Sequence, residues 1–235
     1  MARALINRPD VLLLDEPLGA LDLKLRRQMQ LELKRIQVEV GTTFVHVTHD
    51  QEEAMTMADT VAVMVNGQIE QMGAPEEMYE LPKTVFVSNF LGQSNLLEGR
   101  VVDKSGDDLV VEAAGSRYAL PASRSAVKDG AVVLGVRPEK LTIALESSAL
   151  TRPGDNVIEG TVVDASFVGV STQYLVRTQA GADVVAFEQN MATGDRIRRG
   201  DAVRLSWEPN HSFGLAVPGE GLEAAAEAAA VAAGV

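Results

Sequence analysis

The sequence predicts an α/β region followed by an all-β region of two small barrels. Between Val11 and about Gly92, short apolar runs alternate with longer amphipathic stretches, which is typical of strands and helices in βα order and of a mainly parallel sheet. After about Asn95 the apolar period falls to two, and short strands are separated by Gly and Asp. This second region repeats itself, because NLLEGRVVD (95–103) is matched by NVIEGTVVD (156–164). One strand-and-turn pattern written twice favours two barrels side by side.

The first strand and the helix after it follow from the apolar pattern. Residues 11–15, VLLLD, are apolar on every side up to the final Asp, which predicts a strand buried on both faces. Apolar residues then recur at intervals of three to four, which predicts a helix whose stripe packs on the core and which Gly41 caps. The positions of this stripe are Leu21, Leu25, Met29, Leu33, Ile36 and Val40.

A second strand and a short helix come next. Residues 42–49, TTFVHVTH, predict the strand. Asp50 and Glu53 have the spacing of a capping box, which predicts the start of a helix that runs through Ala58.

The remaining elements are a hairpin, another helix and a tail. Residues 61–72, VAVMVNGQIEQM, predict a hairpin that turns on Asn66 and Gly67, and Pro75 predicts the first turn of a helix. The last stretch, GEGLEAAAEAAAVAAGV (219–235), is rich in Ala and has no large apolar face. It predicts a frayed helix or a disordered tail.

Composition excludes several classes of function. The 235 residues contain no apolar run near the ~18 residues that cross a bilayer, and MARALINRPD lacks the layout of a signal peptide, so a cytoplasmic protein is expected. The absence of cysteine excludes disulfides and thiolate chemistry. A net charge of -12 disfavours nucleic acid as a partner. The small basic cluster of Arg196, Arg198 and Arg199 is more typical of a solvated turn.

Two adjacent carboxylates follow the first strand. Ligands of parallel sheets bind beyond the carboxyl ends of the strands, where Asp15 and Glu16 are expected. There an Asp can hold Mg²⁺, and a Glu can accept a proton from a water that attacks a phosphate. A helix N-cap with a first-turn acid is the alternative, and the dipeptide alone favours it. His49, at the end of the second strand, shifts the balance because it is expected at the same edge, whereas His46 is expected to be structural.

These segments resemble a known family. VLLLDEPLGALD (11–22) and VTHDQEEAMTMAD (47–59) resemble the Walker B, D-loop and H-loop segments of ATP-binding cassette (ABC) transporter ATPases. The second half resembles the paired oligonucleotide-binding-like (OB-like) TOBE barrels of importer ATPases, with GVRPEKL (135–141) as the recurrent motif. The sequence of the chain looks most like those of the spermidine/putrescine members, and the resemblance covers nearly all of residues 2–217.

The resemblance implies a set of roles. It makes Asp15 the magnesium-shell carboxylate, Glu16 the general base, and His49 the γ-phosphate switch, with ATP and Mg²⁺ as cofactors. It also makes Asp22 the D-loop residue that crosses the interface to a second ATPase subunit in a homodimer. The implied partners are transmembrane permease subunits and, indirectly, a solute-binding protein, on the inner face of the cell membrane.

Some motifs of the family are missing. The chain contains no Gly-Lys dipeptide and so no P-loop, and it lacks the Q-loop and the LSGGQ-type signature. MARALINRPD resembles the segment just after that signature, so an internal methionine taken as a start, or a true truncation, is expected. The resemblance then implies a P-loop NTPase remnant (1–92), a TOBE region (93–217) and an Ala-rich tail (218–235). A non-catalytic regulatory or ligand-binding module built on the TOBE barrels is the alternative function.

Overall fold

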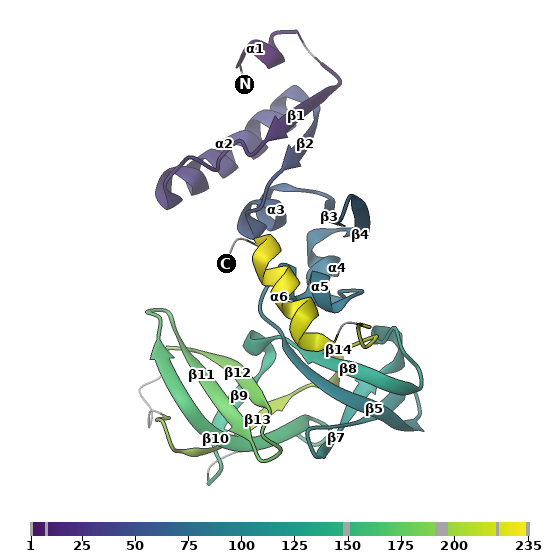
Figure 1. Cartoon of the computed structure of the whole chain (residues 1–235). Coiled ribbons are helices and arrows are strands. Elements are labelled where there is room, and N and C mark those ends of the chain that lie inside the picture. Colours follow the sequence, from purple (N-terminus) through teal and green to yellow (C-terminus); the bar gives the residue numbers. More distant parts are fainter. Residues whose placement is uncertain (1, 8, 148–150, 191–196, 220, 234–235) are drawn as a thin grey trace.

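The computed structural model describes residues 2–7, 9–147, 151–190, 197–219 and 221–233. An α/β part lies at one end of the molecule and the β-rich part at the other (Figure 1). Among these residues, no helix combines the length and the apolar character needed to cross a membrane. Of the basic cluster expected near residue 198, Arg196 lies outside the described residues.

The chain begins with a short helix and a pair of parallel strands. Helix α1 (Ala2–Leu5) precedes β1 (Val11–Asp15), which pairs in parallel with β2 (Thr43–Val47). Leu12 is buried, but the Leu13 side chain on the opposite face is 74% exposed. The prediction of a strand buried on both faces is therefore wrong for these residues, because no element of the described chain covers that face of the sheet.

Helix α2 (Leu23–Val40) connects the two parallel strands. Its N-cap is Asp22, whose carboxylate accepts a hydrogen bond from the Leu25 amide, and its C-cap Gly41 adopts the left-handed conformation. Leu33 is buried against Leu18 and Met57. Other stripe positions are not buried: Leu25 and Val40 are 41% and 45% exposed. The expected core stripe is therefore only partly correct.

The next elements form a second small core. They are α3 (Gln51–Met57), the strands β3 (Val61–Val65) and β4 (Gln68–Gly73), and the helices α4 (Pro75–Glu80) and α5 (Val85–Phe90). Asn66 and Gly67 both have positive φ angles, which confirms the predicted hairpin turn. Met78 of α4 and Val87 of α5 are completely buried with Val63 of β3.

The β-rich part contains two copies of one pattern, four strands, a short 3₁₀ turn and a fifth strand. The first copy consists of β5 (Asn95–Ser105), β6 (Asp108–Ala113), β7 (Ser116–Pro121), β8 (Gly130–Val136) and β9 (Thr142–Leu145). The second consists of β10 (Asn156–Phe167), β11 (Ser171–Thr178), β12 (Asp183–Gln189), β13 (Ala202–Trp207) and β14 (Ser212–Leu215). The 3₁₀ turns are η1 (Ala122–Arg124), η2 (Pro138–Lys140) and η3 (Pro209–His211).

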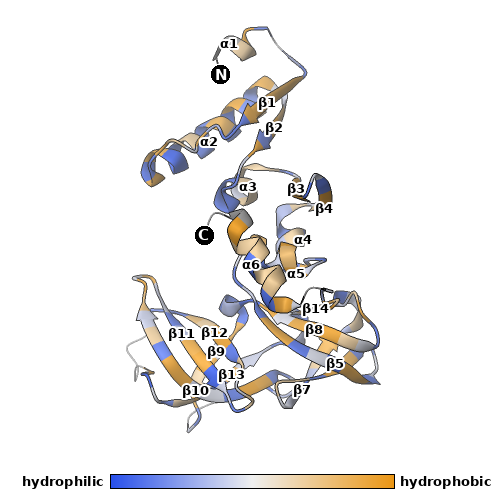
Figure 2. Cartoon of the chain, viewed as in Figure 1, coloured by the Kyte–Doolittle hydropathy of each residue, from blue (hydrophilic) through white to orange (hydrophobic). Residues whose placement is uncertain are grey.

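The two repeats exchange their last strands. Within the described residues, one five-stranded sheet has the order β14-β8-β5-β6-β7 and the other has the order β12-β11-β10-β13-β9. The sheets share one hydrophobic core, in which Tyr118 of the first repeat stacks on Trp207 of the second. Figure 2 shows β8, which carries part of this core, as hydrophobic along most of its length. The expected pair of barrels is therefore present as two half-barrel sheets that are completed by each other's strands.

Gly99 and Gly160 are equivalent glycines of the two repeats and have the same structural role. Gly99 and Gly160 lie beside strand bulges at equivalent positions. A Cβ atom would come within 2.5 Å of the Glu112 carbonyl oxygen at Gly99, and within 2.6 Å of the Arg177 carbonyl oxygen at Gly160. Both positions therefore require glycine for the close approach of the neighbouring strand.

Each repeat also closes the open edge of the other. Strands β7 and β12 lie at the edges of their sheets, where backbone groups lack a neighbouring strand. The Asn156 side chain accepts a hydrogen bond from the Ala119 amide (2.7 Å) and donates one to the Ala119 carbonyl (2.8 Å). Asn95 bonds to the amide and carbonyl of Val185 in the same way, at 2.7 and 2.8 Å. Two asparagine side chains thus take the place of the missing strands.

The C-terminal Ala-rich segment is a packed helix. Helix α6 (Leu222–Ala233), drawn yellow in Figure 1, lies alongside α5. Ala225 and Ala229 are buried, and Ala225 belongs to a cluster with Val85 of α5 and Phe213 of β14. The expectation of a frayed or disordered tail is wrong for residues 222–233, because small side chains allow the helix to approach α5 closely.

Candidate functional site

The candidate site lies at the carboxyl edge of β1 and β2. The amide of Glu16 donates a hydrogen bond to the Val47 carbonyl (2.8 Å), which extends the parallel ladder one residue beyond β1. The chain then turns at Pro17, and the Gly19 amide bonds back to the Glu16 carbonyl (3.3 Å). Leu18, only 2% exposed, anchors this turn in the core beneath α2.

Glu16 is held in an unusual backbone conformation. Its φ angle is 43°, in the left-handed region that non-glycine residues rarely adopt. Such a conformation costs on the order of 1–3 kcal/mol and is found preferentially at functional sites. The turn that follows β1 therefore directs the Glu16 side chain at a cost in stability.

The structure brings Glu16 and His49 together. The Nε2 atom of His49 lies 3.5 Å from Oε1 of Glu16, and the two side chains are 71% and 56% exposed. This separation is long for a direct hydrogen bond, and both groups face solvent. Both groups are therefore accessible to a ligand or a water molecule.

Arg26 of α2 joins the segments that follow the two strands. Its Nη1 atom donates to the Asp50 carboxylate at 2.5 Å, and its Nη2 atom donates to the Leu21 carbonyl at 3.2 Å. Asp50 also accepts from the Glu53 amide as the N-cap of α3, which confirms the predicted helix start. Because Asp50 follows His49 directly, Arg26 fixes the position of the histidine. No local pattern in the sequence predicts this contact, because its partners are 24 residues apart.

Glu53 lies beneath the segment that carries His49. It is 2% exposed, and its Oε2 atom accepts a hydrogen bond from the Thr48 hydroxyl at 3.0 Å. Burial raises the pKa of the Glu53 carboxyl, and the bond from Thr48 offsets only part of this effect. The Thr48 hydroxyl in turn accepts from the Asp50 amide at 3.0 Å. His49 is thus flanked by two backbone positions that are fixed by hydrogen bonds.

Asp15 and Asp22 have separate positions, at the end of β1 and at the end of the turn before α2. Asp15 ends β1 with an exposed carboxylate, and Asp22 caps α2. In the part of the chain that the structure describes, neither forms a hydrogen bond or ion pair with Glu16 or His49. The described residues also contain no group of three or more acidic, His or Cys side chains that could hold a metal ion. The exposed carboxylate of Asp15 is of the ligand type that Mg²⁺ takes when phosphate oxygens and water supply its other ligands.

The chain is similar to known proteins over most of its length. Residues 134–215 match the TOBE domain family. The spermidine/putrescine import ATP-binding protein PotA of Thermobifida fusca is 49% identical over 219 residues, which cover 92% of this chain and 56% of that protein. PotA of Rubrobacter xylanophilus is 49% identical over 215 residues, or 90% of this chain and 55% of its own. The chain is therefore similar along most of its length to spermidine/putrescine import ATP-binding proteins, and its residues 134–215 match the TOBE domain. It spans about half the length of these relatives.

One solved structure also resembles part of this chain. The cytoplasmic molybdate-binding protein ModG, with molybdate bound, aligns with a TM-score of 0.44 and 16% identity. The alignment covers 51% of this chain and 94% of the ModG chain. At this level of similarity the alignment carries no inference about function.

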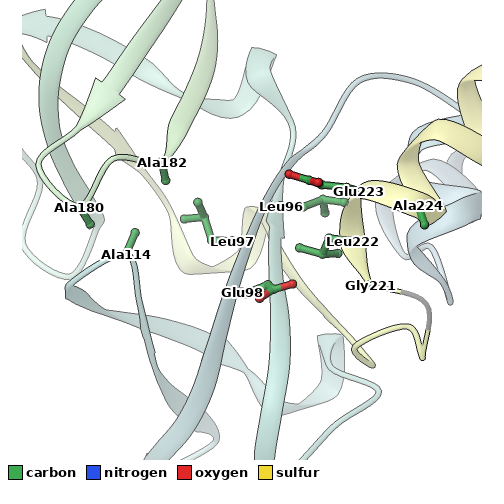
Figure 3. Close-up of a pocket in the computed structure, with 10 residues that line it drawn as sticks. All are labelled: Leu96, Leu97, Glu98, Ala114, Ala180, Ala182, Gly221, Leu222, Glu223 and Ala224. Atoms are coloured by element: carbon green, nitrogen blue, oxygen red, sulfur yellow. The ribbon is translucent and has the colours of Figure 1, made fainter.

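A hollow lies between the two repeats and α6. It has a volume of about 690 Å³ and is open to solvent. Figure 3 shows that aliphatic side chains line most of it, with the carboxylates of Glu98 and Glu223 at its border. Both carboxylates are exposed, so neither is a buried group that requires a ligand. The hollow thus leaves the alternative of a ligand-binding module without a specific observation in its favour.

Proposed function

We propose that this chain, together with a P-loop segment, forms the ATP-binding subunit of an ABC importer that couples ATP hydrolysis to the uptake of a solute, with polyamines as the solute class. The approach of Glu16 to His49 at the carboxyl edge of two parallel strands carries the proposal. A carboxylate and an imidazole at such an edge are suited to the activation of water beside a phosphate. The choice of polyamines as the solute class is supported by the names of the PotA relatives, which are spermidine/putrescine import proteins.

Glu16 is the proposed general base. Its carboxylate is accessible, and the strained turn at Glu16 holds it at the end of β1. It accepts the proton of the water that attacks the terminal phosphate of ATP, a role worth typically about 10²–10⁴-fold in rate. His49 donates a hydrogen bond from Nε2 to the transferring phosphoryl group, and Arg26 holds its segment in place through Asp50.

Asp15 is the proposed carboxylate of the magnesium shell. The ion, when bound with ATP, neutralises negative charge on the phosphate oxygens. Asp15 is suited to this role because its carboxylate is exposed at the end of β1, next to Glu16 in the sequence. Phosphate oxygens and water would complete the coordination, as is usual for Mg²⁺ bound with a nucleotide.

The exposed position of Asp22 suits a contact with a second subunit. Asp22 is exposed at the start of α2, where it is available to a second ATPase subunit in a homodimer. The permease subunits would hold the complex on the inner face of the membrane, and a solute-binding protein would act through them. No nucleic acid is proposed as a partner, in keeping with the net charge of -12.

A chimera tests this function. The N-terminal half of the Thermobifida fusca relative, which this chain does not match, would be joined to residues 1–235. Mg²⁺-dependent ATP hydrolysis by the chimera, and none by the 235-residue chain alone, is the expected result. A folded chimera that binds ATP without hydrolysing it would contradict the catalytic roles and favour the regulatory module.

A further inference from the structure

Arg137 is a buried cation in the segment between β8 and η2. It is 1% exposed and leads the fully buried side chains by volume among the described residues. No carboxylate of the described chain forms a salt bridge with it, and burial lowers its pKa, although a guanidinium stays protonated at neutral pH. A buried charge of this kind is costly unless its donors are satisfied.

The acceptors of Arg137 all belong to the α4–α5 segment and the loop that follows it. Its Nη2 atom donates to the Tyr79 carbonyl at 2.9 Å, and the guanidinium lies 4.0 Å from the centre of the Tyr79 ring. Its Nη1 atom is within 3.2 Å of oxygen atoms of Ser88, Gly92, Gln93 and Ser94. Tyr79 and Ser88 lie near the C-terminal ends of α4 and α5, where the helix dipoles favour a positive charge.

Gly92 adds an independent sign that this loop is built around the guanidinium. Its φ angle is 151°, and a Cβ atom there would lie 3.1 Å from the Tyr79 ring and 3.6 Å from Nη1 of Arg137. Any side chain at this position would press on the contact between the ring and the cation. The loop therefore has the shape that places Arg137 against Tyr79.

The second repeat shows that the fold of a repeat does not need this arginine. The position equivalent to Arg137, between β13 and η3, is Glu208. Its side chain is 51% exposed and pairs with Arg152 at the surface (3.1 Å). The same sequence of strand, 3₁₀ turn and strand thus forms with an exposed glutamate. The first repeat differs in that it contacts the α4–α5 segment, and the hydrogen bonds of Arg137 are made to this segment.

Neighbouring contacts serve the same junction. The Tyr79 hydroxyl donates to Glu139 of η2 at 2.8 Å, and Glu80 pairs with Lys140 at 2.7 Å. Apolar packing adds to them, since Val85 of α5 lies in one cluster with Phe213 of β14. We propose that Arg137 is a positioning residue that locks the α4–α5 segment onto the paired sheets, so that the two parts move as one body.

The lock has a consequence for the candidate site. Met78 of α4 packs in one cluster with Ala54 and Met55 of α3. Helix α3 is capped by Asp50, which follows His49 directly. A change in the orientation of the sheets, transmitted through Arg137, therefore reaches the helix that positions His49.

Distance measurements between spin labels test the lock. The chain contains no cysteine, so labels can be placed on introduced cysteines without background. One pair, at Glu70 of β4 and Lys104 of β5, spans the junction. A second pair, at Lys104 and at Gln179 in the turn between β11 and β12, lies within the β-rich part. All three positions are exposed. In the unchanged protein, each pair is expected to give a single narrow distance distribution.

Three variants of the full chain separate the possibilities. Arg137→Met keeps the aliphatic stem and removes the donors, and should widen the junction distribution about twofold while the pair within the sheets stays narrow, since a rigid contact becomes a hinge. Tyr79→Leu weakens the lock from the other side and should widen the same distribution less. Glu208→Met, the matched change in the second repeat, should leave both distributions unchanged.

Two results would overturn the proposal. If Arg137→Met leaves the junction distribution as narrow as in the unchanged protein, Arg137 does not hold the two parts together. If Arg137→Met widens the distribution within the sheets as well, Arg137 serves the fold of the repeat, and the comparison with Glu208 is misleading.

Discussion

The closure of each sheet edge by an asparagine leads to a quantitative prediction for Asn156→Ala. The change removes the two hydrogen bonds to the Ala119 amide and carbonyl, at 2.7 and 2.8 Å. Both backbone groups then lose their partner at a buried position, since Asn156 is only 4% exposed. An unsatisfied buried group costs about 1–3 kcal/mol, and Ala119 is half-buried, so the loss of unfolding free energy should be about 2–3 kcal/mol. This is a large share of the stability of a small domain.

Urea unfolding followed by tryptophan fluorescence measures this loss. Trp207 is the one tryptophan of the chain, is 3% exposed, and donates to the Ser212 hydroxyl at 2.9 Å. With a slope of about 2 kcal/mol per M urea, the unfolding midpoint should fall by about 1–1.5 M. Asn95→Ala, the equivalent change in the other repeat, should cost about as much, because it removes the same pair of bonds to Val185.

Asn210→Ala is the matched control for these measurements. Asn210 lies in the exposed turn η3 of the same repeat as Asn156, and its replacement should change stability by less than about 0.5 kcal/mol. If Asn156→Ala also costs less than about 1 kcal/mol, the amide bridge does not close the edge, and the reasoning from unsatisfied backbone groups is refuted.

Three further outcomes are expected. In the chimera, His49→Ala should lower the rate of ATP hydrolysis more than the affinity for ATP, since its proposed contact is to the transferring phosphoryl group; a loss of affinity alone would indicate a structural histidine. The 235-residue chain alone should bind ATP weakly, because the P-loop contacts, worth ~1.5–3 kcal/mol each, are not encoded in it, and calorimetry that found micromolar binding would contradict this. Trypsin should cut first within α2, where Arg27 and Arg35 are 60% and 61% exposed, and a first cut within the shared core of the two sheets would count against the packing described.

Local features were predicted well from the sequence. Gly41 caps α2, Asp50 caps α3, and the Asn66-Gly67 turn has the positive φ angles that its hairpin requires. The repeat of NLLEG and NVIEG predicted two equivalent halves. In the structure, the asparagine that begins each half bonds to the edge strand of the other half. In these cases the residue type acts on its own neighbours in the chain, or the same pattern occurs twice.

Features that depend on distant contacts could not be predicted. The exchange of β9 and β14 leaves no local sign, since a strand of four residues fits either sheet equally well. The burial of a strand depends on what covers it, so Leu13 is exposed although it lies in an apolar run. Helix α6 packs through Ala225 and Ala229, which carry too little apolar surface to form a recognisable stripe.

The candidate site shows the same division. The edge that holds Glu16 and His49 was predicted from the ends of two strands, and the structure brings their side chains to 3.5 Å. The support from Arg26 to Asp50 was missed because the partners are on different elements. The roles of Asp15 and Asp22 stay predictions, since the described chain shows an exposed strand end for one and a helix cap for the other.

Nucleotide trapping by Glu16→Gln tests the proposed catalytic role most directly. The variant, made in the chimera, keeps the size of the side chain and removes the base, so ATP should still bind while hydrolysis falls by about 10²-fold or more. Glu70→Gln, the same change at an exposed carboxylate on β4, is the control and should leave hydrolysis unchanged. The Glu16→Gln chimera should therefore retain uncleaved ATP in a stable dimer. Hydrolysis at the unchanged rate by this variant would contradict the assignment of Glu16 as the general base.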